Sequence, residues 1–319
     1  MIEPIDTVVY AARVKDQNVL MSSSSGGAFT AISDYFLSNG HAVVASVYDY
    51  RDSIVEYRLI LDKSLRDLAK GSKYIQSNPG NIYEEAYQWI KSNPDKLLLF
   101  VGMGCQAEGF RKYCELKGIR DKVYIVDIIC HGSPSPKLWK DYVDFYLKSG
   151  KITYLTFKDK RFGWKTPSAY VIMDGKERSI RDYVNVFYNG SALRPSCYEC
   201  PYATTKRKID MTIGDFWHIE KTIPEFYDKR GNSLFLIHTS RGEEIFNIIK
   251  DTLDFKRSNT IQCWQDNLES PTKKPDSRDE FWSEYKEKGI DYLIEKYGKT
   301  SWKSLLKEKL MKFIWRGTK

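Results

Sequence analysis

Two short, uninterrupted apolar runs constrain the fold of this chain more than any other feature of its sequence. The runs are "LLLFV" at residues 97–101 and "VYIVDII" at residues 123–129, and a helical pattern precedes each of them. Continuous apolar strands that alternate with helices are typical of a parallel or mixed sheet that is buried on both faces. A third such unit lies nearer the N-terminus, where a helix with Ser24 or Ser25 as its expected N-cap precedes the β-branched run 41–48.

The pattern changes after Pro136. Residues 151–164 and 167–175 alternate between apolar and polar side chains, as in an antiparallel hairpin. From about Asn267 the sequence becomes strongly charged, with helical spacing of its apolar residues. We therefore predict an α/β fold with a mixed, largely parallel sheet flanked by helices, an antiparallel insertion and a helical C-terminal extension.

The predicted units are an α/β domain at 1–264 and the charged helical extension at 265–319. Within the extension, residues 302–314 place apolar side chains on one helical face between lysines. Packing against the main domain or against a partner is the ordinary role of such a stripe. The sharper alternative is a basic helix that lies on anionic lipid.

The composition predicts a cytoplasmic protein with reduced thiols. The N-terminal segment lacks the basic and apolar regions of a secretory signal, and no apolar run reaches the roughly 18 residues that span a bilayer. The six cysteines are therefore not expected to form a disulfide framework. Lysine and arginine number 50 against 42 acidic residues, a net charge of +8, but they are dispersed along the chain. We expect no nucleic-acid partner, because dispersed charge does not form a binding patch.

Four of the cysteines are candidates for one shared site. Cys105 follows the first apolar run and Cys130 ends the second, so both lie at the carboxyl edge of the predicted sheet. This is the edge at which open α/β sheets bind ligands. Cys197 and Cys200 form a C-x-x-C in a loop that is free to fold over the same edge.

Spacing alone leaves three interpretations of these thiols open. Structural zinc sites usually show two short knuckles, whereas an iron–sulfur cluster needs four thiolates and tolerates wide separation. The third interpretation is that the C-x-x-C is coincidental and the other cysteines are buried. A thioredoxin-like dithiol fits poorly, since Pro195 and Pro201 bracket the pair. Cys114 shares a helical face with Phe110 and is expected in the core, and Cys263 has no partner that spacing identifies.

Several motifs occur in a fixed order between about residues 9 and 264. They are "SSSSGGAFTAISDYFLSNG", "KGSKYIQSNPG", "FVGMGCQAEGFRKY", "VDIICHGSPSP", "FKDKRFGW", "RPSCYECPYA" and "DMTIGDFW". This series resembles the coenzyme F-420 hydrogenase/dehydrogenase beta-subunit family, in its bacterial branch associated with polysaccharide biosynthesis. The resemblance implies a single α/β unit that binds FAD and one 4Fe–4S cluster. The cluster ligands that it implies are Cys105, Cys130, Cys197 and Cys200, and the other two cysteines are then structural.

The resemblance also implies that FAD lies against the serine–glycine loop and the "GSKYIQS" segment. The residues so implied are Ser23, Ser24, Ser25, Gly26, Gly27, Gly71, Ser72, Lys73, Tyr74, Gln76 and Ser77. A glycine pair before a helix lets backbone N–H groups approach a pyrophosphate, although an ordinary capped helix start has the same pattern. Lys73 would add positive charge near the phosphates or the flavin ring.

No residue is assigned as catalytic. Asp210, Gly214 and Asp215 form a turn at a strand end and are candidates to line the site. His131 either faces the site beside Cys130 or is a satisfied core histidine. Relatives commonly have a proline where Gly104 stands, so a looser turn is expected before the first cysteine of the set.

The expected function is a flavin- and iron–sulfur-dependent oxidoreductase that passes electrons between a two-electron substrate at FAD and a redox partner through the cluster. Many relatives carry an N-terminal ferredoxin module that would end where this sequence begins, so a separate ferredoxin or other redox protein is the expected partner. The expected substrate is a small molecule such as a nucleotide sugar. The alternative is a non-catalytic or electron-delivery accessory subunit of a polysaccharide-assembly complex, with its basic C-terminal helix at the inner face of the membrane.

Overall fold

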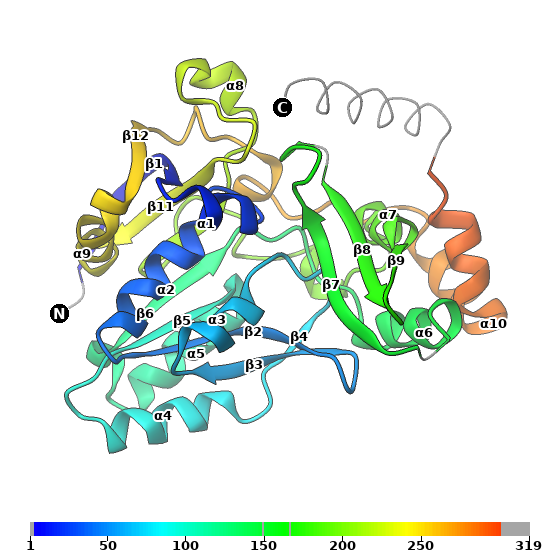
Figure 1. Ribbon diagram of the computed structural model, residues 1–319, viewed down its shortest axis with the longest axis horizontal. Coiled ribbons are helices and arrows are strands. Elements are labelled where there is room, and N and C mark those ends of the chain that lie inside the picture. The colour runs from blue at the N-terminus through cyan, green and yellow to red at the C-terminus, as the bar shows by residue number, and fades with distance from the viewer. Residues whose placement is uncertain (1–2, 149, 166, 301–319) are drawn as a thin grey trace.

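A nine-stranded mixed sheet dominates the described part of the chain, and a three-stranded sheet stands beside it (Figure 1). The computed structural model describes residues 3–148, 150–165 and 167–300, so the helix expected at 302–314 lies outside it. The strand order in the large sheet is β12-β1-β11-β10-β6-β5-β2-β3-β4. Its strands are β1 (Pro4–Val14), β2 (Ala42–Asp49), β3 (Ile54–Ile60), β4 (Ser77–Asn78), β5 (Leu98–Met103), β6 (Val123–Ile128), β10 (Met211–Asp215), β11 (Ser233–Thr239) and β12 (Leu253–Ser258).

The centre of the large sheet is parallel, as the two apolar runs predicted. β6 pairs in parallel with β5 and with β10, and β5 pairs in parallel with β2. Antiparallel pairs flank this centre, with β3 against β2 on one side and β11, β1 and β12 on the other. The predicted mixed α/β class is therefore confirmed.

Helices cover both faces of this centre, because alternate side chains of each strand point to opposite sides. Leu99 of β5 packs in one core with α2, α3 and α9, whereas its neighbour Phe100 packs in another core with α4 and α5. Burial on both faces explains why these strands appear in the sequence as uninterrupted apolar runs. The five helices are α2 (Ala28–Ser38), α3 (Lys63–Ala69), α4 (Ile82–Ser92), α5 (Gly104–Leu116) and α9 (Ser240–Ile249).

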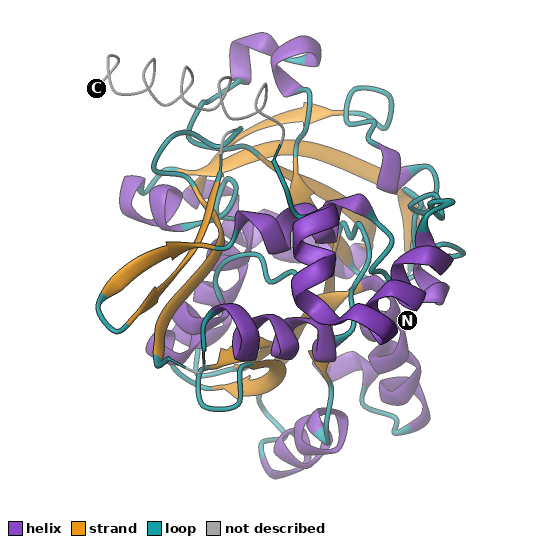
Figure 2. Ribbon diagram, turned by 90° about the vertical axis from the view of Figure 1, so that its right-hand side faces the viewer, coloured by secondary structure: helices purple, strands orange, loops and turns teal. Residues whose placement is uncertain are grey.

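The antiparallel insertion and the C-terminal helix form a separate layer beside the large sheet (Figures 1 and 2). The insertion strands pair as β7-β8-β9, antiparallel throughout, as predicted. They share a core with three helices, in which Trp139 and Phe281 are fully buried. The predicted helical extension is confirmed in α10, and the domain boundary at 264/265 stays a prediction. These elements are β7 (Ile152–Asp159), β8 (Ser168–Met173), β9 (Lys176–Ser179), α6 (Pro136–Tyr146), α7 (Arg181–Asn189) and α10 (Arg278–Tyr297).

Short helical segments connect these larger elements. They are α1 (Gln17–Ser22), α8 (Ile219–Thr222) and the 3₁₀ turns η1 (Arg120–Lys122), η2 (Pro195–Cys197), η3 (Pro224–Phe226), η4 (Lys250–Thr252) and η5 (Asp266–Leu268). Across the three described ranges, no helix combines the length and the apolar character that crossing a bilayer requires.

Candidate functional site

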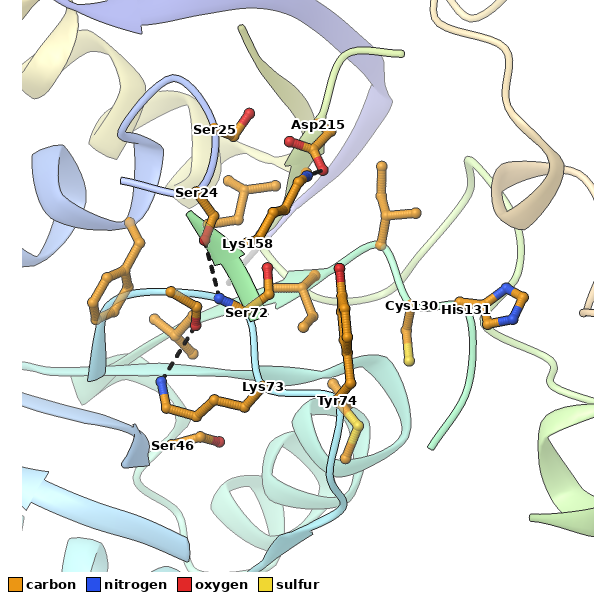
Figure 3. Close-up of a pocket in the computed structure, with 18 of the residues that line it drawn as sticks. Ser24, Ser25, Ser46, Ser72, Lys73, Tyr74, Cys130, His131, Lys158 and Asp215 are labelled. Carbon is orange, nitrogen blue, oxygen red and sulfur yellow. Dashed lines mark hydrogen bonds and ion pairs between the residues drawn. The ribbon is translucent and has the colours of Figure 1, made fainter. Parts of the chain in front are cut away.

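A cavity of about 470 Å³ opens at the carboxyl ends of the central parallel strands (Figure 3). The ends of β5, β6 and β10 contribute Met103, Ile128 and Gly214 to its wall. The small sheet and α7 contribute Lys158 and Tyr188. Both its volume and its position are those of a ligand site in an open α/β sheet.

The serine loop, residues 23–27, forms one end of this cavity and leads directly into α2. The N-cap of α2 is Gly27, with a φ of 90°, and not Ser24 or Ser25 as the sequence suggested. Since glycine has no side chain, the first N–H groups of α2 have no side-chain cap, and this first turn lines the cavity. An uncapped helix N-terminus attracts anions through its free N–H groups and its dipole.

The second predicted flavin segment, residues 71–77, lies directly against the serine loop. The backbone N–H of Ser72 donates to Ser24 Oγ over 3.0 Å (Figure 3). Tyr74 stacks on Phe187 with ring centroids 4.4 Å apart. The fold therefore brings together two segments that the sequence analysis could relate only through the family resemblance.

Lys73 supplies positive charge to this end of the cavity. Its ammonium group donates to three backbone carbonyl oxygens at 2.9, 3.1 and 3.3 Å, and burial lowers its pKa to about 7. Two other lysines of the cavity wall are paired with acids, Lys70 with Asp67 and Lys158 with Asp215. Among the described residues, no carboxylate lies within ion-pair distance of Lys73. Its charge is therefore not paired with an acid, but an anionic ligand would have to replace at least one of the three carbonyl oxygens to bind the ammonium group directly.

Most of the predicted flavin residues line the cavity, and two do not. Gly26 packs against β11, where its N–H donates to Ser233 Oγ over 2.9 Å. A Cβ at this glycine would come within 2.5 Å of the backbone nitrogen of Ser233. In the described structure Gln76 also lies outside the cavity wall. The predicted residues on the wall are Ser23, Ser24, Ser25, Gly27, Gly71, Ser72, Lys73, Tyr74 and Ser77.

The four candidate cysteines converge beside the cavity. Cys105 is partly exposed and belongs to the first turn of α5, because β5 runs directly into that helix without the turn that was expected. Cys130 follows β6 and lines the cavity. Burial raises the pKa of Cys130 to about 12, and the charges of Cys197, Cys105 and Cys200 add to this effect. Burial also raises the pKa of Cys105, and the charges of Cys200 and Cys197 raise it further. The four thiols therefore lie within electrostatic range of one another.

These thiols do not form a site for a single metal ion. Within the three described ranges, no three His, Cys, Asp or Glu side chains stand close enough to hold one ion. All four thiols are free, so none of them is held in a disulfide. That they hold a cluster stays a prediction.

A buried ion pair fixes the C-x-x-C segment to the sheet beside Cys105. Arg207 Nη1 lies 2.5 Å from Asp127 Oδ2, and the two side chains are 4% and 1% exposed. A Cβ on Gly104 would lie 3.0 Å from Tyr202 Cβ and 3.1 Å from Asp127 Oδ2. A proline would meet these atoms, so Gly104 permits a close approach of the C-x-x-C segment and is not the cause of a looser turn.

One charged pair on the cavity wall includes a lysine that the sequence analysis did not select. Lys158 is 5% exposed, forms an ion pair with Asp215, and places its ammonium 4.7 Å from the centre of the Trp217 ring. Trp164 Nε1 donates to the other oxygen of Asp215 over 2.9 Å. The sequence did contain a sign of this lysine: the alternation in "FKDKRFGW" places Lys158 and Lys160 on one side of a strand.

The remaining candidates divide between the site and the core. Asp210 is fully buried, does not line the cavity, and accepts hydrogen bonds from Arg120 and from a backbone N–H of β6. His131 lines the cavity, and burial lowers its pKa. Its Nε2 atom is buried and has no hydrogen-bond partner among the described residues. Cys114 and Cys263 are fully buried in apolar cores, as expected of structural cysteines.

A family model that describes the C terminus of the beta subunit of coenzyme F420 hydrogenase/dehydrogenase matches residues 95–260, just over half of the chain. The chain belongs to this family. The resemblance to this family is thus confirmed, whereas the polysaccharide-associated branch stays a prediction. Membership of the hydrogenase/dehydrogenase beta-subunit family indicates an oxidoreductase with an electron-transfer function. Among curated proteins no match to the chain was found.

Solved structures agree with this assignment at the level of the fold. The chain is similar to one from the F420-reducing [NiFe] hydrogenase complex of Methanosarcina barkeri, studied by xenon derivatization. The TM-score is 0.55 at 17% sequence identity, and the match covers 92% of this chain and 91% of that chain. The same arrangement of elements therefore persists along nearly the full length of both chains.

Proposed function

We propose that this chain is a flavin- and iron–sulfur-dependent oxidoreductase that passes electrons between a two-electron substrate and a ferredoxin-like partner. The observation that carries the proposal is one cavity with an uncapped helix N-terminus and Lys73 at one end and Cys130 on its wall. When bound, FAD would supply two-electron exchange with a substrate, and a 4Fe–4S cluster would supply one-electron transfer.

The residues at the serine-loop end suit the pyrophosphate of FAD. Gly27 and Gly71 have φ values of 90° and 86°, a left-handed backbone that glycine adopts without strain, and a Cβ at Gly27 would lie 2.8 Å from Val14 Cγ2. The uncapped N–H groups of α2 and the ammonium group of Lys73 would then bind the phosphate oxygens. Tyr74 and Tyr188 offer aromatic surface to a planar ring farther along the wall.

The four cysteines suit a cluster better than a zinc ion. Thiolates are the usual ligands of 4Fe–4S clusters, and a cluster holds its four ligands farther apart than a single ion does. In this arrangement the buried pair of Asp127 and Arg207 would hold the C-x-x-C segment against Cys105. The partial exposure of Cys105 would bring one ligand to the protein surface, where a redox partner exchanges electrons.

The far end of the cavity would receive the substrate. There the buried Nε2 of His131, which has no hydrogen-bond partner among the described residues, offers one hydrogen bond, whereas the ion pair of Lys158 and Asp215 lies beside Ser24 and Ser25 at the serine-loop end (Figure 3). These polar groups on a mainly apolar wall are consistent with a nucleotide sugar or a similar glycan precursor, and we propose this substrate class together with a cytoplasmic location and a role in polysaccharide biosynthesis. A membrane contact through the basic C-terminal helix concerns residues 301–319, which lie outside the described part of the chain.

A census of cofactors after anaerobic purification tests this proposal. The purified protein should contain about one FAD and about four irons per chain, measured by chromatography of the released flavin and by iron and sulfide analysis. Colourless protein without flavin or iron would refute the proposal. Flavin without iron would indicate a flavoprotein that lacks the proposed cluster and its one-electron transfer.

Flavin binding should depend on the protonation of Lys73. The pKa of this ammonium is about 7 in the free protein, and a bound pyrophosphate raises it because the opposite charge favours the protonated form. Binding above about pH 7 therefore takes up a proton, and the Kd for FAD should rise by up to about tenfold per pH unit. Fluorescence titration of the apoprotein with FAD at several pH values between about 6 and 9 measures this slope.

The matched control for this titration is Lys73→Met. The variant should bind FAD more weakly at low pH and should show a flat profile across the same pH range, since the titrating group is gone. Equal slopes for the variant and the unmodified protein would exclude Lys73 as the group that binds the phosphates.

A further inference from the structure

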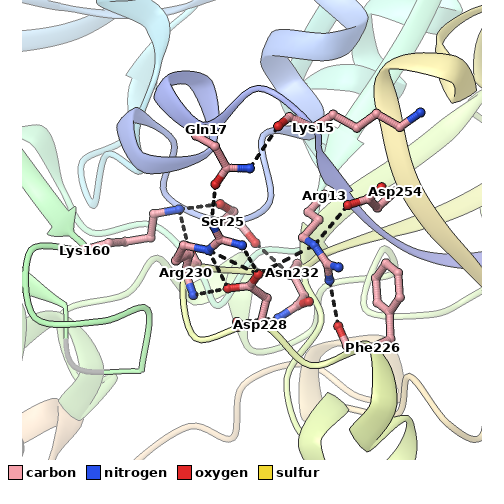
Figure 4. A network of polar contacts seen from close by, with 10 residues as sticks. All are labelled: Arg13, Lys15, Gln17, Ser25, Lys160, Phe226, Asp228, Arg230, Asn232 and Asp254. Atoms are coloured by element: carbon pink, nitrogen blue, oxygen red, sulfur yellow. Dashed lines mark hydrogen bonds and ion pairs between the residues drawn. The ribbon is translucent and has the colours of Figure 1, made fainter. Parts of the chain in front are cut away.

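Lys160 is buried beneath the serine loop and joins three segments of the chain there (Figure 4). The residue directly follows β7 of the small sheet, and it is 3% exposed. Its ammonium group donates hydrogen bonds of 2.6 Å to the carbonyl oxygens of Leu20, Ser25 and Arg230. These oxygens belong to α1, to the serine loop and to the loop between β10 and β11. The three N–H donors of the ammonium group are thus all used.

Lys160 contacts backbone carbonyl oxygens and is not paired with an acidic side chain. Burial of an ammonium group carries a large desolvation cost that hydrogen bonds must offset. Within the described ranges no carboxylate lies at ion-pair distance from Lys160. Burial lowers the pKa of Lys160 to about 7, so its positive charge, directly behind the serine loop, is fully present only below that pH.

The approach of Lys160 depends on a glycine in the neighbouring loop. Gly231 has a φ of 130°, and a Cβ there would lie 2.6 Å from the carbonyl oxygen of Ser25 and 3.1 Å from Lys160 Nζ. The preceding residue, Arg230, is itself held by Asp228, whose carboxylate lies 2.5 Å from its guanidinium group (Figure 4). A rigid loop therefore presents its backbone to the lysine.

The serine loop is held from behind and is left open toward the cavity. Ser25 Oγ donates to the carbonyl oxygen of Asn232 over 2.9 Å, which ties the loop to the segment before β11. The carbonyl oxygen of Gly26 accepts from the N–H of Val14 in β1 over 2.8 Å. With these contacts in place, the backbone enters Gly27 and the uncapped first turn of α2 in a defined direction.

We propose that Lys160 is a positioning residue that holds the serine loop in its phosphate-binding conformation and adds positive charge behind it. The antiparallel insertion would thereby control the affinity of a cavity that is built mainly by the large sheet. The role in flavin affinity rests on the proposed function, whereas the clamp on the loop does not. The ligand class is a diphosphate ester, bound through the opposite side of the same loop.

Lys160→Ala with chemical rescue tests this inference. The substitution removes the propylammonium portion of the side chain, so n-propylammonium can refill the space with the charge and n-propanol can refill it without the charge. With both proteins free of flavin, the backbone amides of residues 23–27 should exchange with deuterium faster in Lys160→Ala than in the unmodified protein. The amides of β5 and β6 should exchange at the same rate in both. The Kd for FAD should rise about tenfold to a hundredfold, because the competent loop is populated for a smaller fraction of the time.

Chemical rescue and a control variant distinguish the role of the lysine's charge from that of the space its side chain fills. n-Propylammonium should restore slow exchange and FAD affinity, and n-propanol should not; equal rescue by both would overturn the role of the charge. Lys151→Ala, at the exposed residue directly before β7, should change neither measurement. Unchanged exchange at residues 23–27 in Lys160→Ala would overturn the clamp. If the unmodified protein holds no flavin, the proposed function fails, while the exchange measurement still decides the clamp.

Discussion

Replacement of Cys197 and Cys200 together by alanine is expected to remove the iron from this protein and to leave its flavin in place. The iron content should fall from about four per chain to background, because a cluster that loses two of its four thiolates is not retained. The flavin should remain, since neither residue lines the cavity within the described structure. Both cysteines lie in a partly exposed loop, so the fold should survive the change. Iron analysis and the visible absorbance spectrum of anaerobic protein measure the result.

Cys263→Ala is the matched control for this experiment. It also removes a thiol, but from a fully buried position in an apolar core, and it should retain the full iron content. If the double variant keeps its iron, the C-x-x-C is not part of the cluster site, and the interpretation of these cysteines as a coincidental pair returns.

Asp210→Ala is expected to destabilise the protein by about 3–5 kcal/mol, the cost of breaking a buried, hydrogen-bonded charge pair. The carboxylate is fully buried and lies 2.7 Å from Arg120. It also accepts from the backbone N–H of Ile125 over 2.8 Å and from Thr239 Oγ1 over 2.9 Å. One side chain thus joins β6, the start of β10 and the end of β11, and its loss leaves three donors without this partner, two of them buried. Urea denaturation followed by circular dichroism measures the loss.

Asp121→Ala is a suitable comparison, because this aspartate is exposed and lies next to Arg120 in the sequence. Its effect on the free energy of unfolding should stay within about 0.5 kcal/mol. A loss of less than about 1 kcal/mol for Asp210→Ala would show that water or a neighbouring group replaces the carboxylate.

The central strands and the positions of Cys105 and Cys130 could be predicted, because they depend on local pattern. A strand buried on both faces is continuously apolar, and its carboxyl end can be located to within a residue or two. The same reasoning could not place β1, whose partners β11 and β12 come from the far end of the chain. Strand order is decided by contacts between distant segments, and periodicity carries no information on them.

In the candidate site, too, local motifs could be predicted and contacts between distant segments could not. The serine loop and the C-x-x-C were visible as motifs, whereas the true N-cap of α2 was not, because Ser24 and Ser25 bind Ser72 and Asn232 instead of capping the helix. Lys160 resembled any other lysine of a charged motif. Only the three-dimensional arrangement shows that its ammonium group faces three carbonyl oxygens.

The place of β1 in the sheet has a consequence for biosynthesis. This strand precedes the other strands of the sheet in the sequence, yet it lies between β11 and β12, with Val9 opposite Ser258. During synthesis its backbone N–H and C=O groups have no permanent partner until β11 and β12 have left the ribosome. A nascent chain of this kind exposes an unpaired strand while all the segments in between are translated, so we expect its yield in cells to depend on chaperones that shield such segments.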